Sequence, residues 1–201
     1  MSAKSRSALL GVVLLLAACA SPAAPRDSFY RLEPATSPPL AHVALPGIVE
    51  VSRFTAEGLA SDRAILYSYR DKPGQVERYS YHLWVEPPAA LLQDQVLNAL
   101  RQAKAAPTVV TSDLRVPPAY VVEGRLRRFE QIAGSAPAVA VELDLGVVRL
   151  HGNELLLLKT YRVEKPAASE AIPDTVQAFE SAVGEVVAHF LDDLSQLPAG
   201  Q

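Results

Sequence analysis

Apolar residues recur at helical spacing in two stretches of the chain. The first covers residues 89–105 and follows Pro87-Pro88, a pair that a first helical turn tolerates. The second covers residues 175–196. The apolar stripes consist of Leu92, Val96, Leu100 and Ala103 in the first stretch and Val176, Phe179, Val183, Val186, Phe190 and Leu194 in the second. This spacing places each stripe on one helix face, so we predict two amphipathic helices.

Strand-like runs occupy much of the remaining chain. Residues 65–69 and 76–85 flank the turn sequence Asp71-Lys72-Pro73-Gly74 and predict a hairpin. Three later runs predict a β-meander, namely residues 120–131, 138–150 and 154–163. In the middle run apolar residues alternate with small or acidic ones, which is typical of a strand with one buried face. The predicted fold class is therefore α+β: a two-layer domain, with a mostly antiparallel sheet and two amphipathic helices packed on one face.

The N-terminus has the layout of a bacterial lipoprotein signal peptide. Lys4 and Arg6 precede an apolar stretch at residues 8–18, and the order Leu16-Ala17-Ala18-Cys19 places a cysteine straight after it. This stretch is well short of the ~20 residues that a membrane-spanning helix needs. We therefore expect cleavage before Cys19 and lipid attachment to it. The alternative is an ordinary signal peptide with a chance cysteine near its cleavage site.

The expected cleavage divides the chain into three parts. Residues 1–18 are the signal peptide, residues 19–28 are a lipidated tether, and residues 29–201 form a single domain. The signal peptide carries two basic residues, so the mature chain keeps 17 basic and 22 acidic residues and a formal charge of −5. Nucleic acid is not an expected partner, because binding its phosphates needs clustered positive charge. Cys19 is the sole cysteine, so we expect no disulfide.

Four short motifs stand out along the chain. They are Leu16-Ala17-Ala18-Cys19, Phe29-Tyr30-Arg31-Leu32, the run from Arg78 to Pro88 that contains Trp84-Val85-Glu86-Pro87, and Ala178-Phe179-Glu180-Ser181-Ala182 after the meander. Together they resemble the ABC-type transport auxiliary lipoprotein family, the PqiC-like proteins. The Trp-x-Glu-Pro run is the most specific of the four, and the resemblance covers essentially the whole mature chain. Residues 54–63 depart from the more compact segment that is typical of the family.

The resemblance implies a membrane-anchored, non-enzymatic component of an intermembrane lipid transport system, with a docking or structural role. The implied partners are an MCE-type periplasmic protein, an inner-membrane permease and its ATPase. A lipoprotein cysteine of this type carries a diacylglyceryl group, usually with a further amide-linked chain. Ala20 stands where an aspartate would suggest retention in the inner membrane, so the resemblance implies the outer membrane, facing the periplasm. The sequence does not decide between a monomer and a homo-oligomer.

An envelope enzyme such as a hydrolase is the alternative class. The chain contains no Gly-x-Ser-x-Gly, His-Glu-x-x-His or Gly-x-Gly-x-x-Gly motif. The four histidines fall in unlike segments and are His42, His82, His151 and His189. We therefore expect no catalytic residue, no metal site and no cofactor. A lipid-carrying binding module is a third possibility, and it requires an apolar cavity between the helices and the sheet.

Trp84 and His82 are the candidate partner-binding residues. Strand alternation places both on the face opposite Leu83 and Val85, which leaves the indole of Trp84 exposed. An exposed tryptophan is typical of a protein interface. The alternative is that residues 54–63 cover it.

The densest basic cluster consists of Arg125, Arg127 and Arg128. A hairpin turn centred between Gly134 and Ser135 places Arg127 opposite Glu142 and Arg125 opposite Asp144. We therefore interpret the cluster as cross-strand ion pairs on the wet face of the sheet. Contact with anionic lipid headgroups is the alternative.

Overall fold

The computed structural model describes residues 25–198, so the predicted cleavage site and lipid attachment at Cys19 lie outside the described residues. The elements, in chain order, are β1 (Ser28–Tyr30), β2 (Ile48–Val51), β3 (Thr55–Ala56), η1 (Gly58–Ser61), β4 (Ala64–Tyr69), β5 (Lys72–Trp84), α2 (Pro88–Gln102), β6 (Thr108–Thr111), η2 (Ser112–Leu114), β7 (Tyr120–Ala133), β8 (Ala138–Arg149), β9 (Glu154–Pro166) and α3 (Ile172–Ser195).

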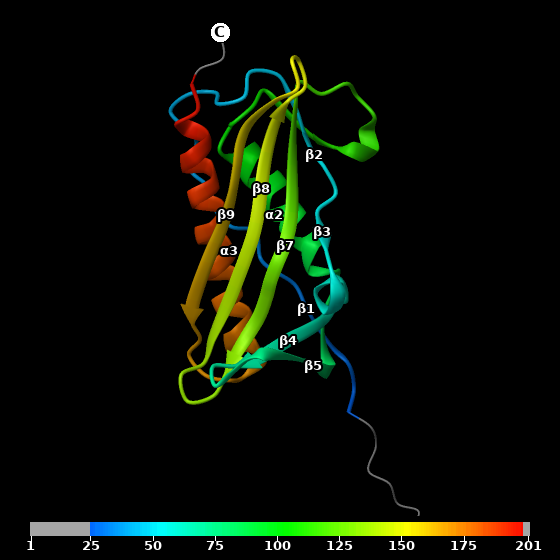
Figure 1. The fold of residues 1–201 in the computed structure, drawn as a ribbon, viewed down its shortest axis with the longest axis vertical. Helices are drawn as coiled ribbons and strands as arrows, with labels where there is room; N and C mark the ends of the chain where they lie inside the picture. Colours follow the sequence, from blue (N-terminus) through cyan, green and yellow to red (C-terminus); the bar gives the residue numbers. More distant parts are fainter. Residues whose placement is uncertain (1–24, 199–201) are drawn as a thin grey trace, which may run out of the picture.

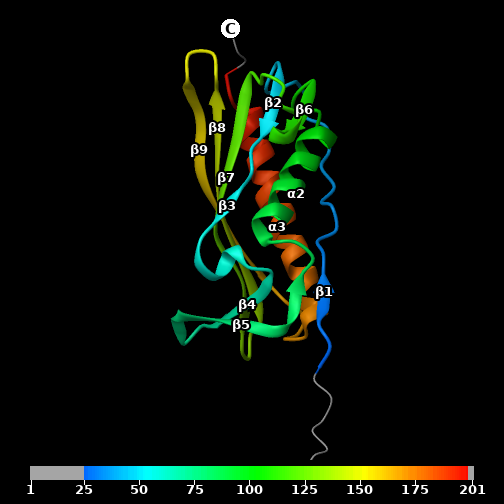
Figure 2. The same ribbon diagram turned by 90° about the vertical axis from the view of Figure 1, so that its right-hand side faces the viewer.

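Both predicted helices are confirmed. Each has a proline in its first two positions, where the missing amide hydrogen removes no helical hydrogen bond. Most residues of the two apolar stripes are buried. Those with at most 2% exposure are Leu92, Val96 and Leu100 on α2 and Phe179, Val183, Val186, Phe190 and Leu194 on α3. α3 packs on β8 and β9, whereas α2 packs on β2, β6 and β7. The helices therefore lie on the same side of the sheet (Figure 2).

The sheet is mixed, so the prediction of a mostly antiparallel sheet is wrong. Its main part has the order β1-β5-β4-β7-β2-β6, and β3 also pairs with β7. Five of the eight strand pairings among residues 25–198 are parallel, namely β1 with β5, β4 with β7, β2 with β7, β2 with β6 and β3 with β7. The predicted hairpin and meander are antiparallel as expected. Side chains alternate in the same way in both kinds of pairing, so the pattern holds no information on strand direction.

A bulge in β7 changes the predicted pairing of the basic cluster. Arg125 lies opposite Asp144, as predicted, but the register shifts between Leu126 and Arg128. Arg128 therefore takes the place opposite Glu142 that was predicted for Arg127. The extra residue at the bulge lets Arg127 turn back to Asp144, with 2.6 Å between Nε and Oδ2. The interpretation as ion pairs on the outer face holds for Arg127 and Arg125 with partners other than those predicted, because Arg127 pairs with Asp144 and Arg125 pairs with Glu57.

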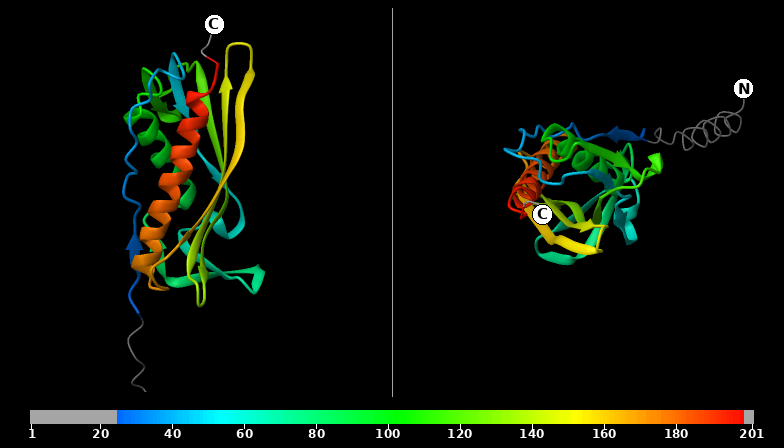
Figure 3. Two further views of the ribbon diagram at one scale, coloured as in Figure 1. Left: turned by 90° about the vertical axis from the view of Figure 1, so that its left-hand side faces the viewer. Right: turned by 90° about the horizontal axis from the view of Figure 1, so that it is seen from above.

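The domain is elongated, and its two ends carry different elements (Figures 1 and 3). One end, called the β1 end, holds β1, the β4–β5 hairpin, the β7–β8 turn and the start of α3. The opposite end, called the far end, holds the β8–β9 turn and the last turn of α3, with β2 and β6 nearby (Figure 2). The described chain begins at the β1 end. None of the helices in residues 25–198 is long and apolar enough to cross a bilayer.

Candidate functional site

Trp84 lies in the core. Its side chain is 0% exposed, and its ring centroid is 5.4 Å from that of Phe129 on β7 and 5.5 Å from that of Phe179 on α3. The expectation that alternation leaves Trp84 exposed is therefore wrong. The reason is an irregularity in the β4–β5 pairing, where Leu66 pairs with Arg78 but Ala64 pairs with Leu83. The additional residues of β5 turn its last part toward the core, so the Trp84 side chain offers no surface to a partner.

His82 lies at the β1 end within a row of aromatic rings. Its Nδ1 atom is 3.0 Å from the hydroxyl of Tyr30 on β1. The ring centroids of successive members are 4.6 to 5.9 Å apart along the row, which runs Tyr30, His82, Tyr79, Tyr67, Tyr69. The row crosses β1, β5 and β4, so it links three strands that are joined at this end of the domain.

The two central phenols of this row remain neutral in the physiological pH range. The hydroxyl of Tyr67 donates to Glu77 Oε2 over 2.6 Å, and this hydrogen bond is the main reason that the pKa of Tyr67 rises to about 12. Burial, followed by the charge of Glu170, raises the pKa of Tyr79, whose hydroxyl donates to Gln131. The row therefore presents uncharged hydroxyls and ring faces rather than an acid or a base.

The described residues offer no metal centre. No group of three His, Cys, Asp or Glu side chains within residues 25–198 is placed to hold a metal ion. His42 lies in an exposed loop, His151 in the β8–β9 turn and His189 on the exposed side of α3.

A shallow hollow of about 570 Å³ lies on the outer face of the sheet. It is lined by Ser52, Arg53, Thr55, Glu123, Gly124, Arg125, Arg127, Asp144, Gly146, Val148, Leu155 and Leu158. Its apolar wall is formed by β9, where Leu155 is 57% and Leu158 is 67% exposed. The registers place Leu155 beside Val148 and Leu158 beside Gly146, whose missing side chain keeps the floor between the strands low. This hollow is called the outer groove.

The opposite wall of the outer groove is charged. Arg125 pairs with Glu57 over 2.7 Å, and Arg127 pairs with Asp144. Burial tends to raise the pKa of Asp144, but hydrogen bonds from Thr160 and Arg127, together with the charge of Arg127, hold it below its usual value. The groove therefore combines exposed leucines with fixed charges of both signs.

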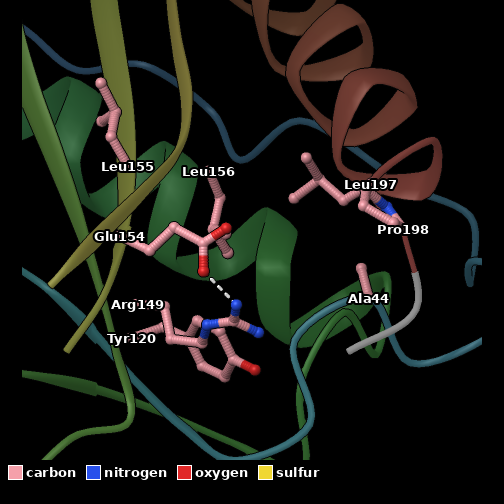
Figure 4. Close-up of a pocket in the computed structure, with 8 residues that line it drawn as sticks. All are labelled: Ala44, Tyr120, Arg149, Glu154, Leu155, Leu156, Leu197 and Pro198. Atoms are coloured by element: carbon pink, nitrogen blue, oxygen red, sulfur yellow. Dashed lines mark hydrogen bonds and ion pairs between the residues drawn. The ribbon is translucent and has the colours of Figure 1, made fainter. Parts of the chain in front are cut away.

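A second, smaller hollow of about 150 Å³ adjoins the outer groove at the far end (Figure 4). Its lining residues are Ala44, Tyr120, Arg149, Glu154, Leu155, Leu156, Leu197 and Pro198. An ion pair between Arg149 and Glu154 joins β8 to β9 beside it. Leu155 lines both hollows, so the two form one candidate site around the first residues of β9.

The leucines of this site were missed by sequence reasoning, although the sequence carries a signal for them. Residues 155–158 are four consecutive leucines, and a strand that alternates between two faces cannot direct all four into one core. The register shift between Val147 and Val148 sets which of them face outward. Leu155 and Leu158 are exposed, and Leu156 and Leu157 are partly buried.

Several known proteins resemble this chain. Protein XCC0632 from Xanthomonas campestris superposes with a TM-score of 0.71 at 22% identity, over 82% of this chain and 92% of that one. A structure described as an uncharacterized protein gives a TM-score of 0.66 at 12% identity, over 84% of this chain and 99% of that one. The protein CT253 from Chlamydia trachomatis gives 0.50 at 9% identity, over 74% of this chain and 98% of that one.

These likenesses show a shared fold. No curated protein matches the chain. A family model described as ABC-type transport auxiliary lipoprotein component matches residues 30–190, from β1 almost to the end of α3. Because this match covers most of the sequence, the chain belongs to the ABC-type transport auxiliary lipoprotein family.

Proposed function

We propose that this protein is a lipid-anchored docking component of an ABC-type system for intermembrane lipid transport. Membership of the auxiliary lipoprotein family supports the transport role. The proposed anchor is a lipid on Cys19, and the residue after it, Ala20, favours the outer membrane. The proposed partner is an MCE-type periplasmic protein that acts with an inner-membrane permease and its ATPase. The proposed role is non-catalytic.

The observation that carries the docking role is the pair of exposed leucines over the outer groove. Leu155 and Leu158 lie on β9 near the far end, whereas the anchored chain enters the domain at the β1 end. A site at the far end faces away from the anchoring membrane and toward a component that extends from the other side of the periplasm. Apolar side chains of such a partner would rest against the leucines, with charged flanks placed to pair with the Arg127–Asp144 wall.

The packing of the core favours docking over lipid carriage. A carrier needs an enclosed apolar cavity between the helices and the sheet. In this domain the space between α3 and β7 is filled by Trp84, Phe129 and Phe179, each at most 2% exposed. The ring centroids of the two phenylalanines are stacked 4.2 Å apart. The outer groove is open to solvent along the sheet, which suits a protein segment better than an acyl chain.

Leu158→Asp is the direct test. An uncompensated carboxylate in an apolar contact costs about 1.4 kcal/mol or more, which corresponds to at least a ten-fold rise in the Kd for the MCE-type partner. Leu59→Asp is the matched control, because Leu59 is also an exposed leucine but lies in η1, outside the lining of both hollows. Binding is measured by co-purification and titration, with thermal unfolding to confirm that both variants fold.

Two results contradict different parts of the proposal. Equal binding by wild type, Leu158→Asp and Leu155→Asp places the docking surface elsewhere. If the wild-type protein does not bind an MCE-type protein, the proposed identity of the partner is wrong. The anchor is tested separately by mass spectrometry of the mature N-terminus, where Cys19→Ser should abolish the added lipid mass.

A further inference from the structure

The exposed apolar side chains differ in kind between the two ends of the domain. The exposed aromatic residues among residues 25–198 are Phe29 on β1, Tyr69 at the end of β4 and Tyr81 on β5, at 53%, 37% and 40% exposure. All three strands lie at the β1 end (Figure 1). The far end carries the exposed leucines Leu150 and Leu155, whereas the β1 end also has an exposed valine, Val76 on β5. Phe29, Tyr69 and Tyr81 together are called the aromatic patch.

The aromatic patch is built from neighbouring strands. Phe29 pairs in register with Leu83, and Tyr81 precedes Leu83 by two residues on the same strand, so the two exposed rings share a face. Tyr69 stands edge-on to Tyr67, with 5.9 Å between ring centroids, at the end of β4, which pairs with β5. The patch is therefore held on paired strands rather than on a loose loop.

The two turns beside the patch differ in charge, because the β4–β5 turn carries Arg70 and Asp71. The β7–β8 turn has the uncharged sequence Gly134-Ser135-Ala136-Pro137. It adjoins the β4–β5 turn, since Tyr69, Ala133 and Gly134 line one shared hollow. In Figure 2 the β4–β5 hairpin runs crosswise to the long strands. One long edge of the hairpin therefore forms part of the surface at the β1 end.

The length of chain before β1 limits the distance between the β1 end and a lipid attached to Cys19. Ser28 follows Cys19 by nine residue steps, which span about 30 Å at most when fully extended. Any bend in this proline-containing segment shortens the reach. The strand that it enters is β1, which itself carries Phe29. The β1 end is therefore the part of the domain closest to the acyl chains.

We propose that the β1 end rests on the membrane that holds the lipid anchor, with Phe29, Tyr69 and Tyr81 in the headgroup layer. This inference rests on the proposed anchor at Cys19. Tyrosine suits the interface because its ring is apolar and its hydroxyl stays hydrated, which is the basis of aromatic belts at membrane surfaces. The guanidinium of Arg63 lies 5.7 Å from the Phe29 ring centroid, in position to pair with a lipid phosphate.

The contact should depend on the aromatic rings more than on lipid charge. Two of the basic residues near the patch have acidic neighbours, since Arg78 lies 3.5 Å from Asp62 and Arg70 pairs with Glu164. A paired charge contributes little to attraction toward an anionic surface. We therefore expect similar contact with neutral and anionic phospholipids, which distinguishes this surface from a basic lipid-binding patch.

The experiment uses full-length lipidated protein in phospholipid vesicles with brominated acyl chains. Cys19 is the native cysteine and is expected to carry the lipid, so an added cysteine can be labelled alone with a fluorophore. Ser80→Cys places the label on β5 beside the patch, and Asn153→Cys places it in the β8–β9 turn at the far end. The expected result is strong quenching at position 80 and none above background at position 153.

Replacing Tyr81 or Phe29 by serine should reduce the quenching at position 80, while vesicle flotation and the lipid mass on Cys19 remain unchanged. Both side chains are substantially exposed, so these variants should fold, and thermal unfolding checks this. Flotation without quenching at position 80 overturns the membrane contact and leaves the anchor standing. Loss of flotation by the wild-type protein overturns the anchor, and the membrane contact with it. Quenching at position 153 would mean that the far end contacts the membrane, and this result also overturns the inference.

Discussion

Trp84→Ala is expected to destabilise the domain strongly. Trp84 ends β5, has no exposed surface and joins three parts of the fold, because its ring contacts the rings of Phe129 on β7 and Phe179 on α3. The substitution therefore removes a large apolar side chain and leaves a cavity between the sheet and the C-terminal helix. The two phenylalanines keep their own stacking and can close this cavity only in part.

The expected loss is about 3 to 5 kcal/mol, the range for removal of a fully buried tryptophan side chain. Each lost aromatic contact accounts for about 0.5 to 1.5 kcal/mol of stability beyond the buried area. Domains of this size have a free energy of unfolding of about 5 to 15 kcal/mol. The variant should therefore still fold, but with a small remaining free energy of unfolding at physiological temperature.

Urea unfolding followed by far-ultraviolet circular dichroism measures this loss. Trp84 is the sole tryptophan, so the wild-type protein also offers an independent check: its fluorescence should be blue-shifted and protected from acrylamide. Tyr81→Ala is the matched control, because Tyr81 lies on the same strand but is 40% exposed, and its loss should stay within about 1 kcal/mol. A cost below about 1 kcal/mol for Trp84→Ala would refute the core assignment.

Two further predictions concern the sheet and acid stability. Gly124→Ala should cost about 1 to 3 kcal/mol in urea unfolding, because an added Cβ would lie 2.5 Å from Phe54 Cγ, and Phe54→Leu in the same chain should recover part of the loss. Burial raises the pKa of Asp193, but Lys159 and Tyr161 outweigh it and hold this pKa below its usual value. The folded state therefore gains stability from the ionised Asp193 above about pH 4, and this gain is lost as the pH falls through the lowered pKa. Asp193→Asn should flatten the acid limb of the stability curve, whereas the exposed neighbour Asp192→Asn should leave it unchanged.

The sequence predicts those elements whose burial follows a simple period. Phe179, Val183 and Phe190 recur at helical spacing, and they identify α3 because only one helix face can meet the sheet. Likewise, the alternation of Val141, Leu143 and Leu145 with Glu142 and Asp144 identifies β8 and the face that it buries. In both cases the local pattern and the tertiary environment agree, so a single-sequence argument is sufficient.

Positions near irregular pairing could not be predicted in this way. An extra residue in a strand reverses which side chains face the core, and no local pattern marks where the extra residue falls. Trp84 follows such an irregularity and is buried, and Arg127 lies at another and pairs with Asp144 instead of Glu142. The parallel pairing of β4 with β7 depends on contacts between distant segments, which residue spacing does not encode.

The length of the domain sets the distance between the two proposed surfaces, the aromatic patch and the outer groove. α3 has 24 residues and extends from the β1 end toward the far end (Figure 3), and at 1.5 Å per residue it spans about 36 Å. If the tether alone held the domain, the outer groove would not keep one orientation relative to the membrane. Contact through the aromatic patch would instead hold the Leu155 end of the groove some 30 to 40 Å above the headgroups. Loss of the aromatic rings should therefore weaken capture of a partner on vesicles more than binding to the same partner in detergent, where orientation has no effect.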